Sequence, residues 1–92
     1  MADVTGEKLD ECVQIVDSMW EVEVASQGYE RQADHAAGML LSGSALQAVA
    51  PGEILGLVDR AIQVGYMAAL KEIQSGMLDE DILEWRPDLQ RD

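Results

Sequence analysis

Residues 51–76 have the sequence PGEILGLVDRAIQVGYMAALKEIQSG, and this stretch decides the fold class. Pro51 suits the first position of a helix, because the N–H that it lacks would have no helical partner there. Glu53 places negative charge at the positive end of the helix dipole, and Gly76 is a typical helix stop. The stretch therefore predicts a long helix over residues 52–75. Apolar residues three and four apart give its predicted buried face: Ile54, Leu55, Val58, Ala61, Ile62, Gly65, Ala68, Ala69 and Ile73.

The preceding segment, residues 6–42, also has helical spacing. Its first apolar face comprises Leu9, Cys12, Val13, Val16, Met19 and Trp20. Between Met19 and Ala25 the apolar residues recur in successive threes, and Gly28 follows. This pattern favours one long, kinked helix over residues 6–42 with Thr5 as its N-cap. Two helices with a break near residues 26–28 are the alternative.

The remaining elements are short. Gly43 predicts a stop, after which residues 44–49 have room for one or two helical turns. Asp79 is suited to cap a short helix over residues 80–85, and residues 88–92 are expected to fray. No stretch sustains the alternation of a strand. We expect one all-α domain over residues 1–92: a small helical hairpin or bundle with two long helices and a short C-terminal one.

The charge balance narrows the classes of partner. Six basic and 18 acidic side chains give a net charge of −12, while 48% of the residues are apolar, which is typical of a folded domain. Such a charge repels phosphate backbones and anionic lipids, so we expect no direct nucleic-acid binding and no membrane binding. It favours a protein partner with a basic surface. The alternative is that the charge only keeps a small protein in solution.

Size and cysteine usage suggest the assembly and the compartment. A chain of 92 residues buries only about 60–65% of its unfolded surface, so we expect a homodimer. The single Cys12 excludes an intramolecular disulfide, and we expect it to be a small buried hydrophobe. No apolar run approaches the roughly 18 residues of a membrane span. The first residues also lack the features of a secretion signal, so a cytoplasmic location is expected.

No residue set predicts catalysis, a cofactor or a metal site. Cys12 and His35 lie far apart along one expected helical segment, too far for a nucleophile and its base. The residue three before His35 is Gln32, which breaks the Glu-x-x-His pattern of di-metal bundles. The acidic run at Asp79 resembles the start of a calcium loop, but Glu84 stands where that loop needs glycine. We expect a protein that is not an enzyme.

Small residues predict where helices pack closely. Ala61, Gly65 and Ala69 are spaced by four, as are Ala33 and Ala37, and such rows let two backbones approach. Glycine inside a helix costs about 1 kcal/mol relative to alanine, and close packing is one way to offset that cost. These five residues are the expected helix-packing or oligomer contacts. The alternative for Gly65 is a glycine tolerated on a loosely packed face.

Two tryptophans lie beside acidic residues and are candidate partner contacts. Each indole is either a core anchor or a binding hot spot, and Trp85 is the better candidate for binding because an acidic cluster surrounds it. Acidic residues steer a basic partner, and apolar residues supply the contact. The expected partner-binding residues are Glu80, Asp81, Glu84 and Trp85 near the C-terminus, and Asp17, Trp20 and Glu21 in the first helix.

These features together favour a small acidic regulator or inhibitor that occludes a basic or apolar groove on a larger partner. A nucleic-acid-handling complex or a transcription factor is an example of such a partner. Phage counter-defence proteins and anti-activators share this size and charge, which is an analogy of form. A structural or assembly adaptor, or a chaperone-like subunit, is the first alternative. An antitoxin-like dimeric regulator is the second.

Overall fold

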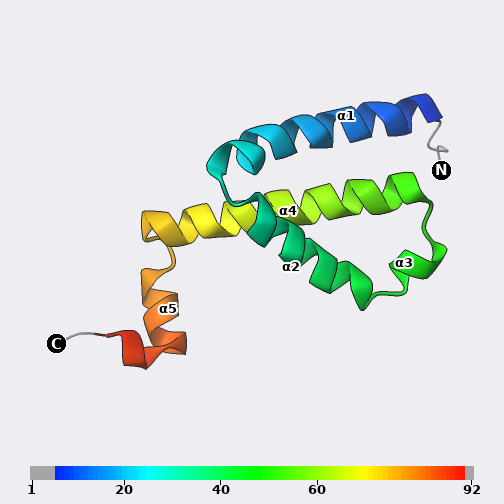
Figure 1. Ribbon diagram of the computed structural model, residues 1–92. Helices are drawn as coiled ribbons and strands as arrows, with labels where there is room; N and C mark the ends of the chain where they lie inside the picture. Colours follow the sequence, from blue (N-terminus) through cyan, green and yellow to red (C-terminus); the bar gives the residue numbers. More distant parts are fainter. Residues whose placement is uncertain (1–5, 91–92) are drawn as a thin grey trace.

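The computed structural model describes residues 6–90, and within them the fold is all-α, with no strand. The helices follow one another along the chain, joined by short turns (Figure 1). Their bounds are α1 Gly6–Glu23, α2 Glu30–Ser42, α3 Leu46–Val49, α4 Gly52–Ser75 and α5 Asp79–Trp85, with single 3₁₀ turns η1 at Ala25–Gln27 and η2 at Pro87–Leu89. The bounds of α4 match the helix expected over residues 52–75.

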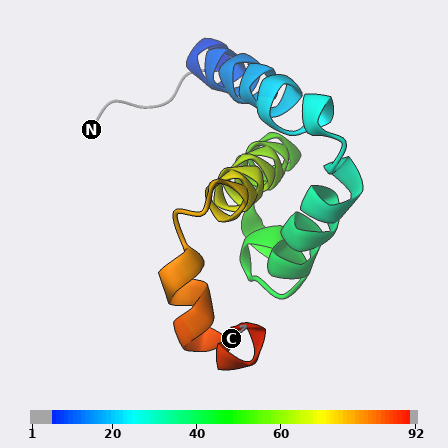
Figure 2. The same cartoon turned by 90° about the vertical axis from the view of Figure 1, so that its left-hand side faces the viewer.

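The central element is α4, against which both α1 and α2 pack. Figure 2 views the molecule from the end where α4 stops, and shows α1 above α4, α2 on one flank and the other flank uncovered. At that end α5 leaves the bundle and extends away from it (Figure 1). The result is an elongated molecule of 57 × 29 × 28 Å, which exposes more surface than a rounded one of the same size.

The segment over residues 6–42 is broken, so the alternative that the sequence left open is the one observed. The first helix ends at Glu23, η1 follows, and Gly28 has a φ of +80° before α2 begins at Glu30. A left-handed backbone of this kind reverses the chain at little steric cost only for glycine. The break lets α2 turn back along α4, and Val24 is fully buried at the corner. The expected cap Thr5 lies outside the described residues.

The face that α4 buries differs from the predicted one. Gln63 and Met67 are the buried residues of α4, whereas Ala61, Gly65 and Ala68 are exposed. Burial of Gln63 is tolerated because both polar atoms of its side-chain amide have a hydrogen-bond partner. Its Oε1 accepts from Trp20 Nε1 at 2.7 Å, and its Nε2 donates to Asp59 Oδ2 at 3.0 Å. Burying a polar group costs little free energy when the group has hydrogen-bond partners. For this reason the apolar pattern alone predicted the wrong orientation of α4.

The core is correspondingly small. The buried hydrophobic residues are Val24, Ala33, Ala37 and Met67. Trp20, Val64, Tyr66 and Leu70 pack against the cluster of Val24, Ala33 and Met67. Ala33 and Ala37 are both completely buried, and their small side chains let α2 lie close to α4. By contrast, a Cβ at Gly65 would meet no atom within 4 Å. The row of Ala61, Gly65 and Ala69 therefore makes no close helix contact within the chain.

The ends of α4 and α5 show which helix boundaries the local sequence predicted correctly. Gly76 ends α4 with a φ of +88°, and the next N–H, that of Met77, donates to the Glu72 carbonyl at 3.2 Å. Asp79 is the first residue of α5 and not its cap, and Leu78 before it provides no side-chain cap. Part of the tail expected to fray forms η2, while residues 91–92 lie outside the described part of the chain.

Candidate protein-binding site

The α5 arm, residues 79–89, lies outside the packing of α1 and α2 on α4. Apart from η2, no element packs extensively against α5. Trp85 is 67% exposed, and Leu89 is also exposed. An indole left in water at this level is costly unless another surface covers it. The arm therefore exposes apolar surface that no other helix among residues 6–90 covers extensively.

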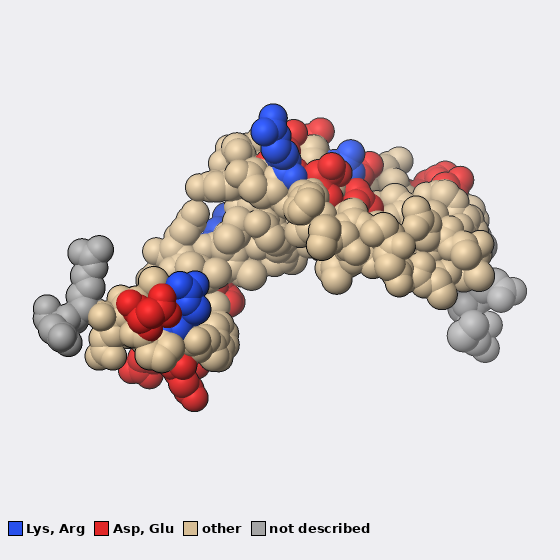
Figure 3. Space-filling model, turned by 60° about the horizontal axis from the view of Figure 1, so that its bottom comes forward, with Lys and Arg blue, Asp and Glu red and all other residues tan. Residues whose placement is uncertain are grey.

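Acidic and apolar residues occupy different sides of the α5 arm. At 100° per residue, Glu80, Asp81 and Glu84 lie on one side of the helix, and all three are exposed. Ile82, Leu83 and Trp85 lie on the remaining arc, where Ile82 is half-buried. The structure thus brings together the four C-terminal residues that the sequence singled out. Figure 3 shows acidic and basic side chains gathered on the lobe that α5 forms.

A local ion pair neutralises the basic residue next to Trp85. Arg86 donates from Nε to Asp88 Oδ1 at 3.0 Å and from Nη2 to Asp88 Oδ2 at 2.8 Å. The Arg86 hydrogen bond lowers the pKa of the Asp88 carboxyl, and the same contact raises the pKa of Arg86. Both groups are exposed, so the pair orients the chain after α5 more than it stabilises the fold. Because Arg86 pairs with Asp88, it does not neutralise the charges of Glu80, Asp81 and Glu84.

Trp20 is placed differently from Trp85. It is half-buried between α1 and α4, its N–H is donated to Gln63, and the Arg60 guanidinium lies 3.8 Å from its ring centroid. Arg60 also pairs with Asp17, Nε to Oδ1, at 3.8 Å. Of the expected contacts on the first helix, only Glu21 is exposed without such an internal role. Trp20 and Asp17 thus take part in the α1–α4 contact, while Asp17 and Glu21 both remain exposed.

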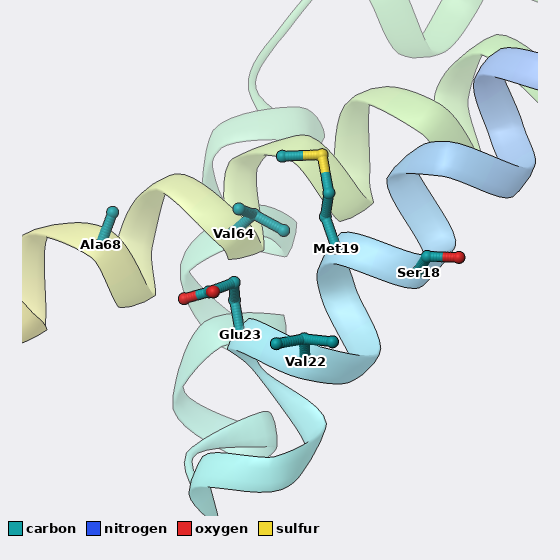
Figure 4. A pocket seen from close by; sticks show the side chains of 6 residues that line it. All are labelled: Ser18, Met19, Val22, Glu23, Val64 and Ala68. Carbon is teal, nitrogen blue, oxygen red and sulfur yellow. The ribbon is translucent and has the colours of Figure 1, made fainter.

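The structure also contains an apolar groove between α1 and α4, which sequence reasoning missed. It encloses about 510 Å³ and is lined by Ser18, Met19, Val22, Glu23, Val64 and Ala68. Met19 extends from α1 toward Val64 on α4, and Glu23 lies at one end of the groove (Figure 4). Glu23 pairs with Lys71, so the charge at that end is compensated. The signal that could have revealed the groove is the unusual width of the apolar face of α1.

The residues with catalytic potential lie apart on the surface. Cys12 is exposed, so the expectation that it is buried is wrong, because α1 turns a neighbouring face toward α4. His35 is exposed on α2. Among residues 6–90, no group of three or more His, Cys, Asp or Glu side chains is arranged to hold a metal ion. Within the same residues, no helix combines the length and apolar character that a membrane crossing requires.

Comparisons of the chain with protein-family models, with curated proteins and with solved structures found no match.

Proposed function

We propose that this chain is a non-enzymatic, acidic protein-binding regulator whose α5 arm docks onto a basic groove of a larger protein and occludes it. The observation that carries the proposal is the position of Trp85. It is 67% exposed on an arm with few internal contacts, next to three exposed carboxylates. A cytoplasmic setting belongs to the proposal, because a reducing compartment keeps the exposed Cys12 as a free thiol.

The two sides of the arm would contribute in different ways. Glu80, Asp81 and Glu84 would attract a positive surface and raise the rate of encounter, an effect that salt screens over about 10 Å at 0.1 M. Trp85 would supply short-range affinity by losing its exposed apolar area to a pocket on the partner. Truncation of a tryptophan in such a position typically costs 2 kcal/mol or more. Binding should therefore weaken with rising salt and also depend on the indole.

One observation favours a second candidate function, that of an assembly adaptor. The groove between Met19 and Val64 is apolar, and its only lining charge, Glu23, is paired with Lys71. An adaptor that held a client through this groove would bind with little salt dependence. The sign and steepness of the salt effect therefore separate the two functions.

To test this, the wild-type chain and its variants are immobilised and exposed to a lysate of the native host. The proteins that each retains are identified by mass spectrometry and compared. The triple variant Glu80→Gln, Asp81→Asn, Glu84→Gln and the single variant Trp85→Ala should each lose the specific partner. Two matched controls should retain it. The first, Glu7→Gln, Asp10→Asn, Glu30→Gln, removes the same charge from exposed positions of α1 and α2 that are not candidate contacts. The second, Met39→Ala, truncates a side chain that is 65% exposed on α2.

Three results would count against the proposal. Equal loss with both triple variants would show that net charge acts without a defined site. Retention by Trp85→Ala would remove the arm from the interface. A partner whose retention is unaffected by both arm variants and by 0.5 M salt, about five times the 0.1 M reference condition, would favour the adaptor. Far-UV circular dichroism on each variant checks that helix content is unchanged.

A further inference from the structure

The apolar face of α1 is about twice as wide as the part of it that α4 covers. Leu9, Val13, Val16 and Trp20 are half-buried toward α4, while the adjoining stripe of Cys12, Ile15, Met19 and Val22 is exposed. At 100° per residue the two rows together span about 180°, whereas a surface helix usually needs an apolar arc of about 100°. Ile15 and Val22 are 62% and 63% exposed. Half of this face therefore has no partner among residues 6–90.

The uncovered face of α4 continues this surface. Val64 and Ala68 line the groove with Met19, and Ala61 and Gly65 follow around α4 on its exposed side. A Cβ at Gly65 would meet open space. This is the face that the apolar pattern of residues 51–76 marked for burial. Both helices thus expose apolar surface on the side of the bundle where the groove lies.

We propose that a second copy of the chain covers this side of the bundle and that the protein is a two-fold symmetric dimer. The interface, called the α1–α4 patch below, comprises Cys12, Ile15, Met19 and Val22 of α1 with Ala61, Val64, Gly65 and Ala68 of α4. In a two-fold interface the same patch of each copy takes part, so a contact of one residue with a second is repeated with the two copies exchanged. The large side chains of α1 form a ridge and the small ones of α4 a flat strip, so each ridge lies on the partner copy's strip.

Charge favours a second copy over a basic protein as the occupant. The chain carries a net charge of −12, yet residues 61–70 contain no charged side chain. Two like-charged copies meet with least repulsion on an uncharged surface, while a basic partner would be drawn to the acidic arm instead. The nearest charges at the end of the groove, Glu23 and Lys71, already neutralise each other. The patch is therefore suited to self-association.

The exposed area is sufficient for such an interface. The chain exposes 6981 Å², whereas a compact monomer of its mass, 10.0 kDa, exposes about 5,200 Å². The excess of about 1,700 Å² is roughly twice the 800 Å² that one partner contributes to a standard interface. This excess includes the α5 arm, and about half of it would be enough for one such interface. This proposal does not rest on the proposed regulatory function, since the two use different surfaces.

The test is sedimentation equilibrium of the full chain under reducing conditions, from about 5 µM to 1 mM and at low and high salt. We expect a dimer whose dissociation constant falls as salt rises, because salt screens the repulsion between the copies. The double variant Ile15→Gln, Val22→Gln should raise that constant at least tenfold. The matched control Met39→Gln, Leu40→Gln alters side chains that are 65% and 63% exposed on α2, and should leave it unchanged.

A second variant separates the interface from the fold. A Cβ at Gly65 would meet open space among residues 6–90, so we expect the Gly65→Leu monomer to stay folded while the larger side chain disrupts the flat strip and weakens the dimer. A wild-type chain that stays monomeric at 1 mM, roughly the weakest useful affinity, would overturn the proposal, and the occupant would then be another protein. Equal dissociation constants for the wild type and the patch variant would also overturn it. So would loss of the dimer in the control.

Discussion

The substitution Trp20→Phe tests the polar contact that lets α4 bury Gln63. The phenyl ring keeps most of the apolar packing but removes the N–H that donates to Gln63 Oε1 at 2.7 Å. Gln63 is only 2% exposed, so this oxygen would lose its partner in a position that water reaches poorly. An unpaired buried acceptor costs about 1–3 kcal/mol. The weaker attraction of Arg60 to a phenyl ring adds about 0.5 kcal/mol.

The expected loss in the free energy of unfolding is therefore about 1.5–3.5 kcal/mol. For a chain of this size, each kcal/mol corresponds to about 4–8 °C in Tm. The measurement is urea and thermal unfolding followed by far-UV circular dichroism, at one protein concentration for all variants. Trp85→Phe is the matched control, because its indole is exposed and the same change there should stay within about 0.5 kcal/mol.

A double variant identifies the cause of the loss. Trp20→Phe combined with Gln63→Leu removes acceptor and donor together, so it should be more stable than Trp20→Phe alone. If Trp20→Phe costs no more than Trp85→Phe, the hydrogen bond does not support the buried amide. If the double variant is less stable than Trp20→Phe, the loss comes from packing and not from an unpaired oxygen.

Three further predictions follow from local geometry. Gly28→Ala should lower the free energy of unfolding by about 1 kcal/mol in urea titrations, because φ is +80° there; an unchanged midpoint would refute the strained turn. Gly65→Ala should raise it by up to about 1 kcal/mol at concentrations where the chain is monomeric, since the added methyl meets open space; a loss would contradict that exposure. The Asp88 carboxyl should titrate below its ordinary pKa in NMR, and Arg86→Gln should return it upward; identical titrations would disprove the pair.

The sign of the Asp88 effect follows from the direction of its pKa shift. Since Arg86 lowers the pKa of the folded carboxyl, the pair is intact at pH values above the ordinary carboxyl range. It is lost as the pH falls through the lowered pKa. The order that this pair gives to the end of the α5 arm should therefore persist at neutral pH, where we propose that the arm binds its partner.

The two proposed surfaces respond to salt in opposite directions, which makes them separable. Contacts of Glu80, Asp81 and Glu84 with a basic protein should weaken as salt rises, while association through Ile15 and Val22 should strengthen. A chain that dimerises but binds no partner would contradict only the regulatory function. A monomeric chain that binds a basic protein through Trp85 would contradict only the dimer.

Local signals in the sequence determined the helices and several of their ends. Pro51 and Gly76 bound the long helix because a missing N–H and a left-handed glycine act within a few residues of themselves. The acidic and apolar residues around Trp85 could also be grouped in advance, since they are neighbours on one short helix. Such properties depend on nearest neighbours, so they need no knowledge of the fold.

Tertiary structure alone decided which faces are buried. The sequence marked Ala61, Gly65 and Ala69 for burial, yet α4 buries Gln63 and Met67, because Trp20 and Asp59 from distant and nearby turns satisfy the amide of Gln63. Apolar periodicity reflects only the order of hydrophobic residues along one helix. It cannot predict the hydrogen bond between Trp20 and Gln63, which are 43 residues apart in the sequence. The same limit hid the groove beside Met19, which exists only where two separate helices meet.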